Sequence, residues 1–319
     1  MTRVNGKKLK HLLGLRDLSA EEITSILDLT ISMKEVMQRS VRKVPALLGK
    51  NIITLFYEPS TRTRTSFDVA AKNLSANTTN IAIAQSSAKK GETLIDTAKN
   101  LEVMGYDAVI IRHGYSGAPH LLAKNIKGSV INAGDGCNEH PTQGLLDIFT
   151  MREKKGDLAG KKIVIVGDIA HSRVARSNIW GLSKLGAEVV VSAPPTLIPQ
   201  GVEDMGCKVE INLAKALAGA DFVNVLRLQL ERQTEGLFPS IEEYHKFYGI
   251  TSDKIKVCKN DVIVMHPGPI NRGVEISSEV ADGASNVILE QVTNGVAVRM
   301  AVLFLLLSGK KAILSSSKL

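Results

Sequence analysis

The chain has 319 residues, of which 44% are hydrophobic and 23% charged, an ordinary composition for a soluble globular protein. This length is long for one hydrophobic core and suits two domains. The net charge of +8 raises the question of nucleic-acid binding, but aromatic residues make up only 4%, so stacking surfaces for bases are scarce. We expect a solvated basic surface and no nucleic-acid partner.

The cysteines and the apolar runs predict the compartment. Cys137, Cys207 and Cys258 are odd in number, far apart and without metal-site spacing. This argues against a disulfide framework or a structural zinc, and for a reducing compartment. The longest uninterrupted apolar run, Ala301 to Leu307, is far shorter than the roughly 20 residues that span a bilayer. No secretory signal is visible, so we expect a cytoplasmic protein with no membrane association.

Helices and strands are predicted to alternate through the first half of the chain. Ser19 and Glu22 form a capping box that starts a helix, and the residues after it keep helical apolar spacing. The apolar runs that follow suit strands covered on both faces. The predicted strands are 51–57, 80–84, 107–112 and 129–133, and the predicted helices between them are about 63–73 and 93–104.

A second series of elements begins after the polar, glycine-containing link 154–160. Its predicted strands are 161–167, 187–192, 220–225 and 261–265. Its predicted helices are 173–185 and a final helix to which the strongly apolar run 297–307 belongs. Alternating strands and helices indicate parallel sheets flanked by helices. We therefore predict an α/β fold of two domains, each with one such sheet. The first is 1–150, with the C-terminal helix of about 290–319 packing back on it, and the second is 151–289.

Chemically dense segments follow the predicted strands in both halves. They are 60–65, 85–92 and 112–113 in the first half, and 168–173, 227–229 and 266–272 in the second. In open α/β sheets, ligands bind beyond the carboxyl ends of the strands. We therefore expect an active site in a cleft between the two domains.

The segment 58–66 is the clearest signal for anion binding. It places one proline, five hydroxyl side chains and two arginines between an apolar run and a helix start. Such a loop points backbone N–H groups and the positive end of the helix dipole at one spot, and arginine adds a donor fork that suits phosphate. An ordinary N-cap and turn with exposed arginines is the structural alternative.

Two histidines precede prolines near predicted strand ends. His140 comes before an apolar helix whose first turn holds Gln143, and His266 follows a strand. A lone histidine is more often structural than catalytic, but Gln143 is placed to reach the same point as His140. A serine and two lysines in 86–93 would also suit an anion, although loops of this composition are usually only solvated.

Together these segments resemble the motif set of the aspartate carbamoyltransferase catalytic chain, in the aspartate/ornithine carbamoyltransferase superfamily. The resemblance covers about residues 10–307, with the motifs in the expected order. The matching segments are Ser60-Thr-Arg-Thr-Arg-Thr65, Ser86 with Lys90-Gly-Glu-Thr93, His140-Pro-Thr-Gln143, Arg227-x-Gln229 and His266-Pro-Gly-Pro269. Ornithine carbamoyltransferase shares the first loop but has a cysteine after the later histidine, where this chain has Pro267. A carbamoyltransferase acting on ornithine or another amino acid is the alternative.

The resemblance implies transfer of the carbamoyl group from carbamoyl phosphate to the amine of L-aspartate, giving N-carbamoyl-L-aspartate and phosphate, in de novo pyrimidine biosynthesis. It implies catalytic roles for Arg62, Thr63, Lys90, Arg112 and His140. The implied carbamoyl-phosphate ligands are Ser60, Thr61, Arg62, Thr63, Ser86, Arg112, His140 and Gln143. The implied aspartate ligands are Lys90, Arg173, Arg227, Gln229, Gly268 and Pro269.

The resemblance implies no metal and no organic cofactor. It implies a homotrimer in which a neighbouring subunit donates Lys90 to the active site, and it leaves association with regulatory chains or a dihydroorotase open. A nicotinamide-dependent oxidoreductase is a rival from another class, because Ile163 to Gly167 begins a βα unit. However, the Gly-x-Gly-x-x-Gly fingerprint is missing after Gly167.

Overall fold

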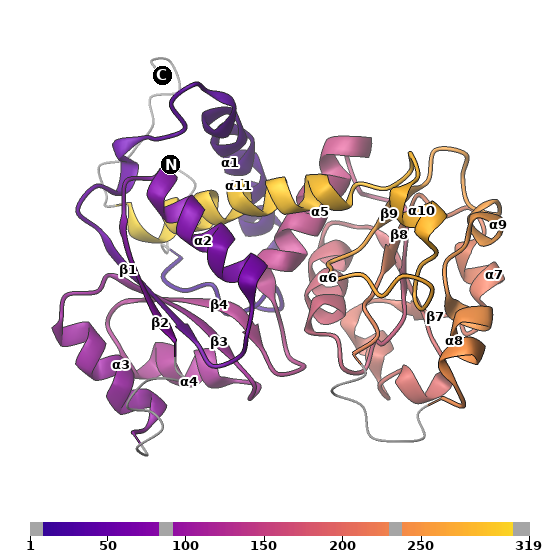
Figure 1. Ribbon diagram of the computed structural model, residues 1–319, viewed down its shortest axis with the longest axis horizontal. Helices are drawn as coiled ribbons and strands as arrows, with labels where there is room; N and C mark the ends of the chain where they lie inside the picture. The colour runs from indigo at the N-terminus through magenta and orange to yellow at the C-terminus, as the bar shows by residue number, and fades with distance from the viewer. Residues whose placement is uncertain (1–8, 83–91, 230–237, 309–319) are drawn as a thin grey trace. The chain divides into compact units, whose positions relative to one another are not determined.

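The computed structural model describes residues 9–82, 92–229 and 238–308, and the chain folds as two compact units (Figure 1). Unit 1 comprises Glu21–Gly136 and the described parts of Met1–Gly14 and Gly295–Leu319. Unit 2 comprises Leu15–Ala20 and the described parts of Cys137–Asn294. Each unit holds a parallel sheet flanked by helices, which confirms the predicted fold class.

Unit 1 is built on a sheet whose described strands run in the order β2-β1-β3-β4, with every neighbouring pair parallel. The strands are β1 (Asn51–Phe56), β2 (Asn77–Ala82), β3 (Ala108–His113) and β4 (Ser129–Asp135). The helices are α1 (Ala20–Gln38), α2 (Thr61–Asn73), α3 (Leu94–Val103) and α4 (Ala118–Asn125). In Figure 1, α3 and α4 lie on one side of this sheet, and α1 and α2 lie on the other.

Alternate strand residues of unit 1 pack against α3 and α4. The cluster contains Ile53, Leu55, Val109, Ile111 and Val130 from the strands, and Ala98, Leu101, Leu122 and Ile126 from the helical side. Burial of each large aliphatic side chain stabilises the unit by about 1.5–3 kcal/mol. The carboxyl ends of β1 and β3 are thereby held on a packed layer, which gives the loops that follow them a fixed base.

Unit 2 has a second sheet, whose described strands run in the order β7-β6-β5-β8-β9 and are all parallel to their neighbours. The strands are β5 (Lys162–Val166), β6 (Glu188–Ser192), β7 (Lys208–Val209), β8 (Phe222–Val225) and β9 (Ile263–Met265). The helices are α5 (Pro141–Lys155), α6 (Arg173–Lys184), α7 (Leu213–Leu217), α8 (Ile241–Tyr248), α9 (Ser252–Ile255) and α10 (Ser278–Asp282). One face of the sheet packs valines of β5, β6, β8 and β9 against α7 and α10.

The last helix, α11 (Ile288–Leu307), contains the apolar run 297–307 and begins close to the predicted start at about 290. The apolar pattern is interrupted by Gln291 and Asn294, which are nevertheless buried because they donate hydrogen bonds to α5. Polar residues of α11 therefore face another helix and not solvent. The elements that were not predicted include α4, β7, α7, α8, α9 and α10.

By length and composition, α11 could cross a membrane, but 61% of its most apolar window is buried inside the protein. The Arg299 guanidinium lies 5.1 Å from the centre of the Phe67 ring on α2. At the next residue of α11, the Met300 sulfur lies 3.7 Å from the amide nitrogen of Asn73, also on α2. We conclude that α11 is a buried core helix.

Candidate active site

Each sheet contains a point where the chain changes the side on which it adds strands. In unit 1 this switch point lies between β1 and β3, and in unit 2 it lies between β5 and β8. Loops that leave adjacent strands there diverge, and open α/β sheets bind their ligands beyond the carboxyl ends of such strands. Most of the described residues predicted for the site follow β1, β3, β5, β8 or β9.

The loop after β1 opens α2 with exposed polar side chains. Ser60 is the N-cap residue, with extended backbone angles (φ −161°, ψ 95°) and no side-chain cap hydrogen bond. Thr61 and Arg62 in the first turn are exposed, whereas Thr63 is buried. The positive end of the helix dipole therefore coincides with hydroxyl and guanidinium groups, an arrangement that stabilises a bound anion.

Arg112 lies at the same sheet edge, opposite Phe56 of β1. Its Nε lies 3.3 Å from a carboxylate oxygen of Glu58, and its Nη1 donates a hydrogen bond of 3.4 Å to the carbonyl of Ala133. The loop after β1 and strand β4 thus hold the guanidinium from two sides. Glu58 was not predicted as a site residue, although it directly precedes the Pro59 that opens the hydroxyl-rich loop. Ser86 and Lys90 lie outside the described residues.

His140 caps α5 and is fixed through its backbone. Its N–H donates to the Ser177 hydroxyl at 2.9 Å, and that hydroxyl donates to the Glu139 carboxylate at 2.9 Å. Glu139 also accepts the N–H groups of Leu15 at 2.6 Å and Arg16 at 3.2 Å. His140, Ser177 and Glu139 are all buried. Sequence reasoning found His140 but missed the two residues that hold it.

Gln143, in the first turn of α5, points its amide nitrogen at a second buried carboxylate. Gln143 Nε2 donates to Asp147 Oδ1 at 2.9 Å, Gln291 Nε2 donates to the same oxygen at 2.7 Å, and Asn178 Nδ2 donates to Oδ2 at 2.8 Å. Burial raises the pKa of Asp147 to about 6, and these hydrogen bonds oppose the rise. The spacing of Gln143 and Asp147, four positions apart on a helix, was the one sequence signal for this contact.

The switch point of unit 2 brings two predicted segments together. Leu226 N–H donates to the Val166 carbonyl at 2.8 Å, which joins the ends of β8 and β5. Gln229 Nε2 then donates to the His171 carbonyl at 3.1 Å, so the loop after β8 contacts the loop that begins α6. Arg173, the first residue of α6, is 4% exposed, and Arg227 is half-buried.

The loop after β9 is held by a buried histidine and carboxylate. Gly268 N–H donates to His266 Nδ1 at 2.8 Å, so the imidazole proton is on Nε2, which lies 3.1 Å from Glu275 Oε1. The same Glu275 oxygen accepts the N–H of Asn271 at 2.6 Å. Both His266 and Glu275 are almost wholly buried. Their role in this structure is to fix the loop.

This loop also reaches the neighbouring one. The Asn271 side chain donates to the Leu228 carbonyl at 3.3 Å, between Arg227 and Gln229. Gly268 has φ of 62°, in the left-handed region that favours glycine, and the Gly268–Pro269 peptide is cis. The structure therefore brings the loops that carry Arg173, Arg227, Gln229 and Gly268 to one edge of the unit 2 sheet.

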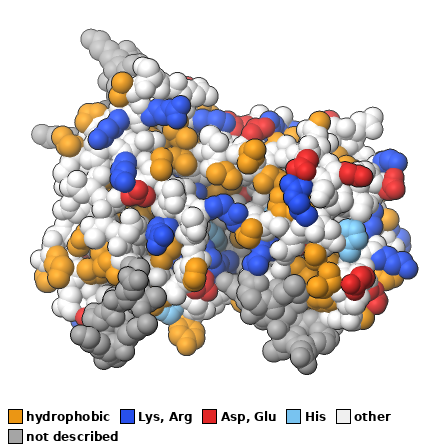
Figure 2. Space-filling model, in the orientation of Figure 1, with side chains coloured by type: hydrophobic (Ala, Val, Ile, Leu, Met, Phe, Trp, Pro, Cys, Tyr) orange, Lys and Arg blue, Asp and Glu red, His pale blue; other side chains and the backbone are white. Residues whose placement is uncertain are grey.

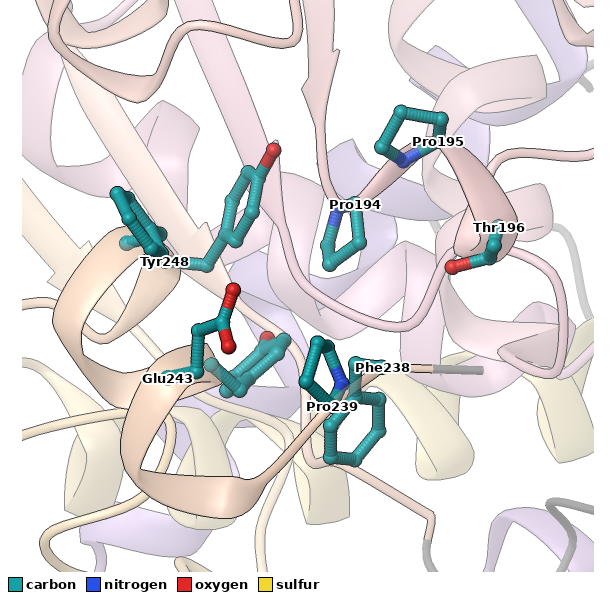
Figure 3. Close-up of a pocket in the computed structure, with 9 residues that line it drawn as sticks. Pro194, Pro195, Thr196, Phe238, Pro239, Glu243 and Tyr248 are labelled. Carbon is teal, nitrogen blue, oxygen red and sulfur yellow. The ribbon is translucent and has the colours of Figure 1, made fainter. Parts of the chain in front are cut away.

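A separate pocket of about 630 Å³ lies beside α8 (Figure 3). It is lined by proline and aromatic side chains, among them Pro194, Phe238, Tyr244 and Tyr248. None of the predicted site residues that the structure describes lines it. Tyr244 lines it and is buried, and a Cβ on Gly167 would lie 3.1 Å from the Tyr244 hydroxyl. This close approach explains why a glycine follows β5.

Basic side chains are spread over both units on the face drawn in Figure 2, where they are mixed with acidic and hydrophobic ones. Several pair with carboxylates, as Lys50 does with Asp107 at 2.6 Å and Arg272 with Asp282 at 2.7 Å. Nucleic-acid backbones favour a continuous basic stripe. The distribution on this face is that of a solvated basic surface.

The two halves of the chain match two family models. Residues 10–153 match "Aspartate/ornithine carbamoyltransferase, carbamoyl-P binding domain", and residues 159–306 match "Aspartate/ornithine carbamoyltransferase, Asp/Orn binding domain". The chain belongs to the aspartate/ornithine carbamoyltransferase family. The family resemblance that the motifs indicated is confirmed.

Within this family, similar curated proteins are aspartate carbamoyltransferase catalytic subunits. The one from Heliobacterium modesticaldum is 59% identical over 94% of this chain and 96% of its own length. The one from Moorella thermoacetica is also 59% identical, over 94% of this chain and 98% of its own length.

Solved structures in the family include both acceptor types. Aspartate transcarbamoylase from Trypanosoma cruzi, in complex with carbamoyl aspartate and phosphate, has a TM-score of 0.85 at 27% identity, covering 95% of this chain and 98% of its own. Ornithine carbamoyltransferase from Pyrococcus furiosus has a TM-score of 0.83 at 32% identity, with the same coverage. The fold alone therefore does not separate aspartate from ornithine as the acceptor.

Proposed function

We propose that this chain transfers the carbamoyl group of carbamoyl phosphate to the amine of L-aspartate, using the motif residues of both units. The aspartate carbamoyltransferase activity rests on family relatives that are 59% identical over 94% of the chain. The observation that best supports the residue roles is the clustering of motif groups at the carboxyl edges of adjacent strands in each sheet.

Unit 1 holds the phosphate. Ser60, Thr61, Arg62 and Thr63 offer hydroxyl, backbone and guanidinium donors at the start of α2, and Arg62 contributes a charge-assisted contact. Ser86 and Lys90 add to this set in the proposal. Because phosphate is the leaving group, donors that bind its developing charge more tightly than they bind the intact acyl phosphate also lower the barrier.

Thr63, Arg112 and His140 donate hydrogen bonds to the carbamoyl carbonyl oxygen. Negative charge builds on this oxygen when the aspartate amine attacks the carbon, so preset donors stabilise the transition state; losing one typically costs about 2.7–4 kcal/mol. Gln143 and the carbonyls of Gly268 and Pro269 accept hydrogen bonds from the carbamoyl nitrogen and set its orientation.

Aspartate is held through its two carboxylates by Arg173, Arg227 and Gln229, with Lys90 reaching the same ligand. A new C–N bond forms, the C–O bond to phosphate breaks, and the departing phosphate accepts the amine proton. No side chain acts as a nucleophile in this scheme. Orientation of two bound reactants supplies much of the rate.

Steady-state kinetics on two single variants test the division of labour. Arg62→Ala should lower turnover by orders of magnitude, because a charge-assisted phosphate contact of about 1.5–3 kcal/mol and the substrate's orientation are lost together. Arg227→Ala should raise KM for aspartate far more than KM for carbamoyl phosphate. Arg64→Ala, on the exposed part of the same helix turn as Arg62, is the control. Equal effects of Arg227→Ala on both substrates would show that the aspartate clamp is wrongly assigned.

We also propose a cytoplasmic homotrimer in which Lys90 of one chain completes the site of its neighbour. The three cysteines are free thiols, the form that a reducing compartment maintains. Mixing Lys90→Ala chains with Arg62→Ala chains tests the sharing, since hybrid trimers contain some sites with neither substitution. Recovery of activity on mixing is expected; no recovery in a confirmed hybrid trimer would refute sharing.

Ornithine is the second candidate acceptor, favoured by the similarity to the Pyrococcus furiosus enzyme. Phosphate release from carbamoyl phosphate should be measured with aspartate and, separately, with ornithine. We expect release with aspartate. Release with ornithine alone would overturn the assignment of the acceptor.

A further inference from the structure

A buried network in unit 2 joins the two segments to which the proposed function assigns recognition of the carbamoyl nitrogen. One segment is Gln143 at the start of α5, and the other is the loop that begins at His266. The residues that link them, Asp147 and Gln291, belong to none of the matched motifs. Both are almost completely buried.

The links are four hydrogen bonds, three of which meet at Asp147. Its Oδ1 accepts Nε2 of Gln143 at 2.9 Å and Nε2 of Gln291 at 2.7 Å, and its Oδ2 accepts Nδ2 of Asn178 at 2.8 Å. Gln291 then uses its Oε1 to accept the backbone N–H of His266 at 3.0 Å. One carboxylate therefore contacts Gln143 directly and the His266 backbone through a single intervening side chain.

The chemistry of a carboxylate fixes which way the Gln143 amide faces. An ionised carboxylate only accepts hydrogen bonds, so it selects the NH₂ end of the amide and leaves the oxygen pointing the other way. Without it, the two ends of an amide are almost isosteric and the side chain is free to invert. The same reasoning applies to Gln291, whose amide oxygen is thereby kept on the His266 N–H.

We infer that Asp147 is a positioning residue for the carbamoyl nitrogen. It presents the Gln143 oxygen as an acceptor and, through Gln291, holds the start of the loop whose carbonyls accept from the same NH₂ group. The inference rests on the proposed roles of Gln143, Gly268 and Pro269. It predicts that Asp147 determines the preference for a carbamoyl group over a group of the same shape without N–H donors.

Acetyl phosphate supplies that comparison, because a methyl group replaces the amino group and the phosphate is unchanged. Affinities of carbamoyl phosphate, acetyl phosphate and inorganic phosphate for the assembled enzyme should be measured by calorimetry. The wild type should prefer carbamoyl phosphate over acetyl phosphate. Asp147→Leu should reduce this preference roughly 10-fold, the effect of one or two lost hydrogen bonds, with little change for inorganic phosphate.

Two further variants separate positioning from folding. Asp147→Asn keeps an acceptor oxygen for Gln143 and Gln291. Its new NH₂ group can donate to Oδ1 of Asn178, which is buried without a hydrogen-bond partner in the described structure. This variant should retain most of the preference. Thr150→Val removes the acceptor of the Asn294 amide, a hydrogen bond of 2.9 Å one turn further along the same two helices, and should leave the preference unchanged.

The outcomes are distinct. A carbamoyl-to-acetyl preference in Asp147→Leu equal to that of the wild type overturns the inference, and so does an equal loss of affinity for all three ligands. If Asp147→Leu fails to fold, Gln291→Met provides the test, because it breaks only the arm to His266 and should lower the preference by a smaller factor. If the wild type itself does not bind carbamoyl phosphate, the proposed function fails, independently of Asp147.

Discussion

Replacement of Ser177 by alanine tests whether the buried network behind His140 supports both stability and turnover. The Ser177 hydroxyl accepts the His140 N–H at 2.9 Å and donates to Glu139 at 2.9 Å, and Ser177 is fully buried. Ser177→Ala leaves a buried N–H without its acceptor and takes one donor from a buried carboxylate. Each unsatisfied buried group costs about 1–3 kcal/mol. Since Glu139 keeps the amides of Leu15 and Arg16, we expect a total loss of about 2–4 kcal/mol.

The assay is urea unfolding with linear extrapolation, together with kcat and KM for both substrates. If His140 shifts, kcat should fall by about tenfold or more, because misplaced donors stabilise the developing oxyanion poorly. Ser183→Ala is the matched control, since that hydroxyl also lies on α6 but makes an exposed 2.9 Å hydrogen bond to the Gly206 carbonyl. A Ser177→Ala variant as stable and as active as Ser183→Ala would refute the reasoning.

Three further predictions concern other buried or capping contacts. Burial raises the pKa of Asp147 from 3.8 to about 6, so the folded chain binds this proton more tightly than the unfolded chain does. That stabilisation is present below about pH 4 and is lost as pH rises through about 6. Relative to Asp147→Asn, the wild type should therefore lose ~3 kcal/mol of unfolding free energy between about pH 4 and pH 7. Parallel profiles of stability against pH for the two proteins would contradict this. Gly268→Ala should cost about 1–2 kcal/mol in unfolding free energy because φ is 62° there, and an unchanged urea midpoint would argue against it. Lys184→Met removes the ammonium group that donates to the carbonyls of residues 15, 16 and 18 at 2.5–2.8 Å. It should lower Tm clearly more than the control Lys208→Met, which breaks only an exposed ion pair with Glu188.

The sequence predicted the sheets well because their strands are short apolar runs covered on both faces. The run at β5, for example, was predicted as 161–167 and is observed as Lys162–Val166. The burial of polar residues was harder to predict: Gln291 and Asn294 of α11 face α5, a contact that no local pattern reveals. The helix α4 was missed because Gly117 and Pro119 were typical of a turn, whereas they form its cap and first turn.

The site divides in the same way. The residues proposed to meet a ligand lie on loops with unusual chemistry, such as Ser60 to Thr63, and their positions after strands were visible in the sequence. Residues that hold them are ordinary in type and distant in the chain; Asp147 and Gln291 are 144 positions apart. Glu139, beside His140, and Asp147, one turn after Gln143, were near enough to be considered, but their importance depends on burial, which only the folded chain shows.

The assignment of α11 to two units has a consequence for how the polypeptide is made. Residues up to Asn294 group with unit 2, while those from Gly295 onward group with unit 1, where Arg299 covers Phe67 and Met300 meets Asn73. A ribosome that has released the first 136 residues has therefore not yet released all of the side chains that complete the earlier unit. Chimeras between relatives should exchange the segment after Asn294 together with the N-terminal half, because a swap at a single internal junction would leave α2 against a foreign helix.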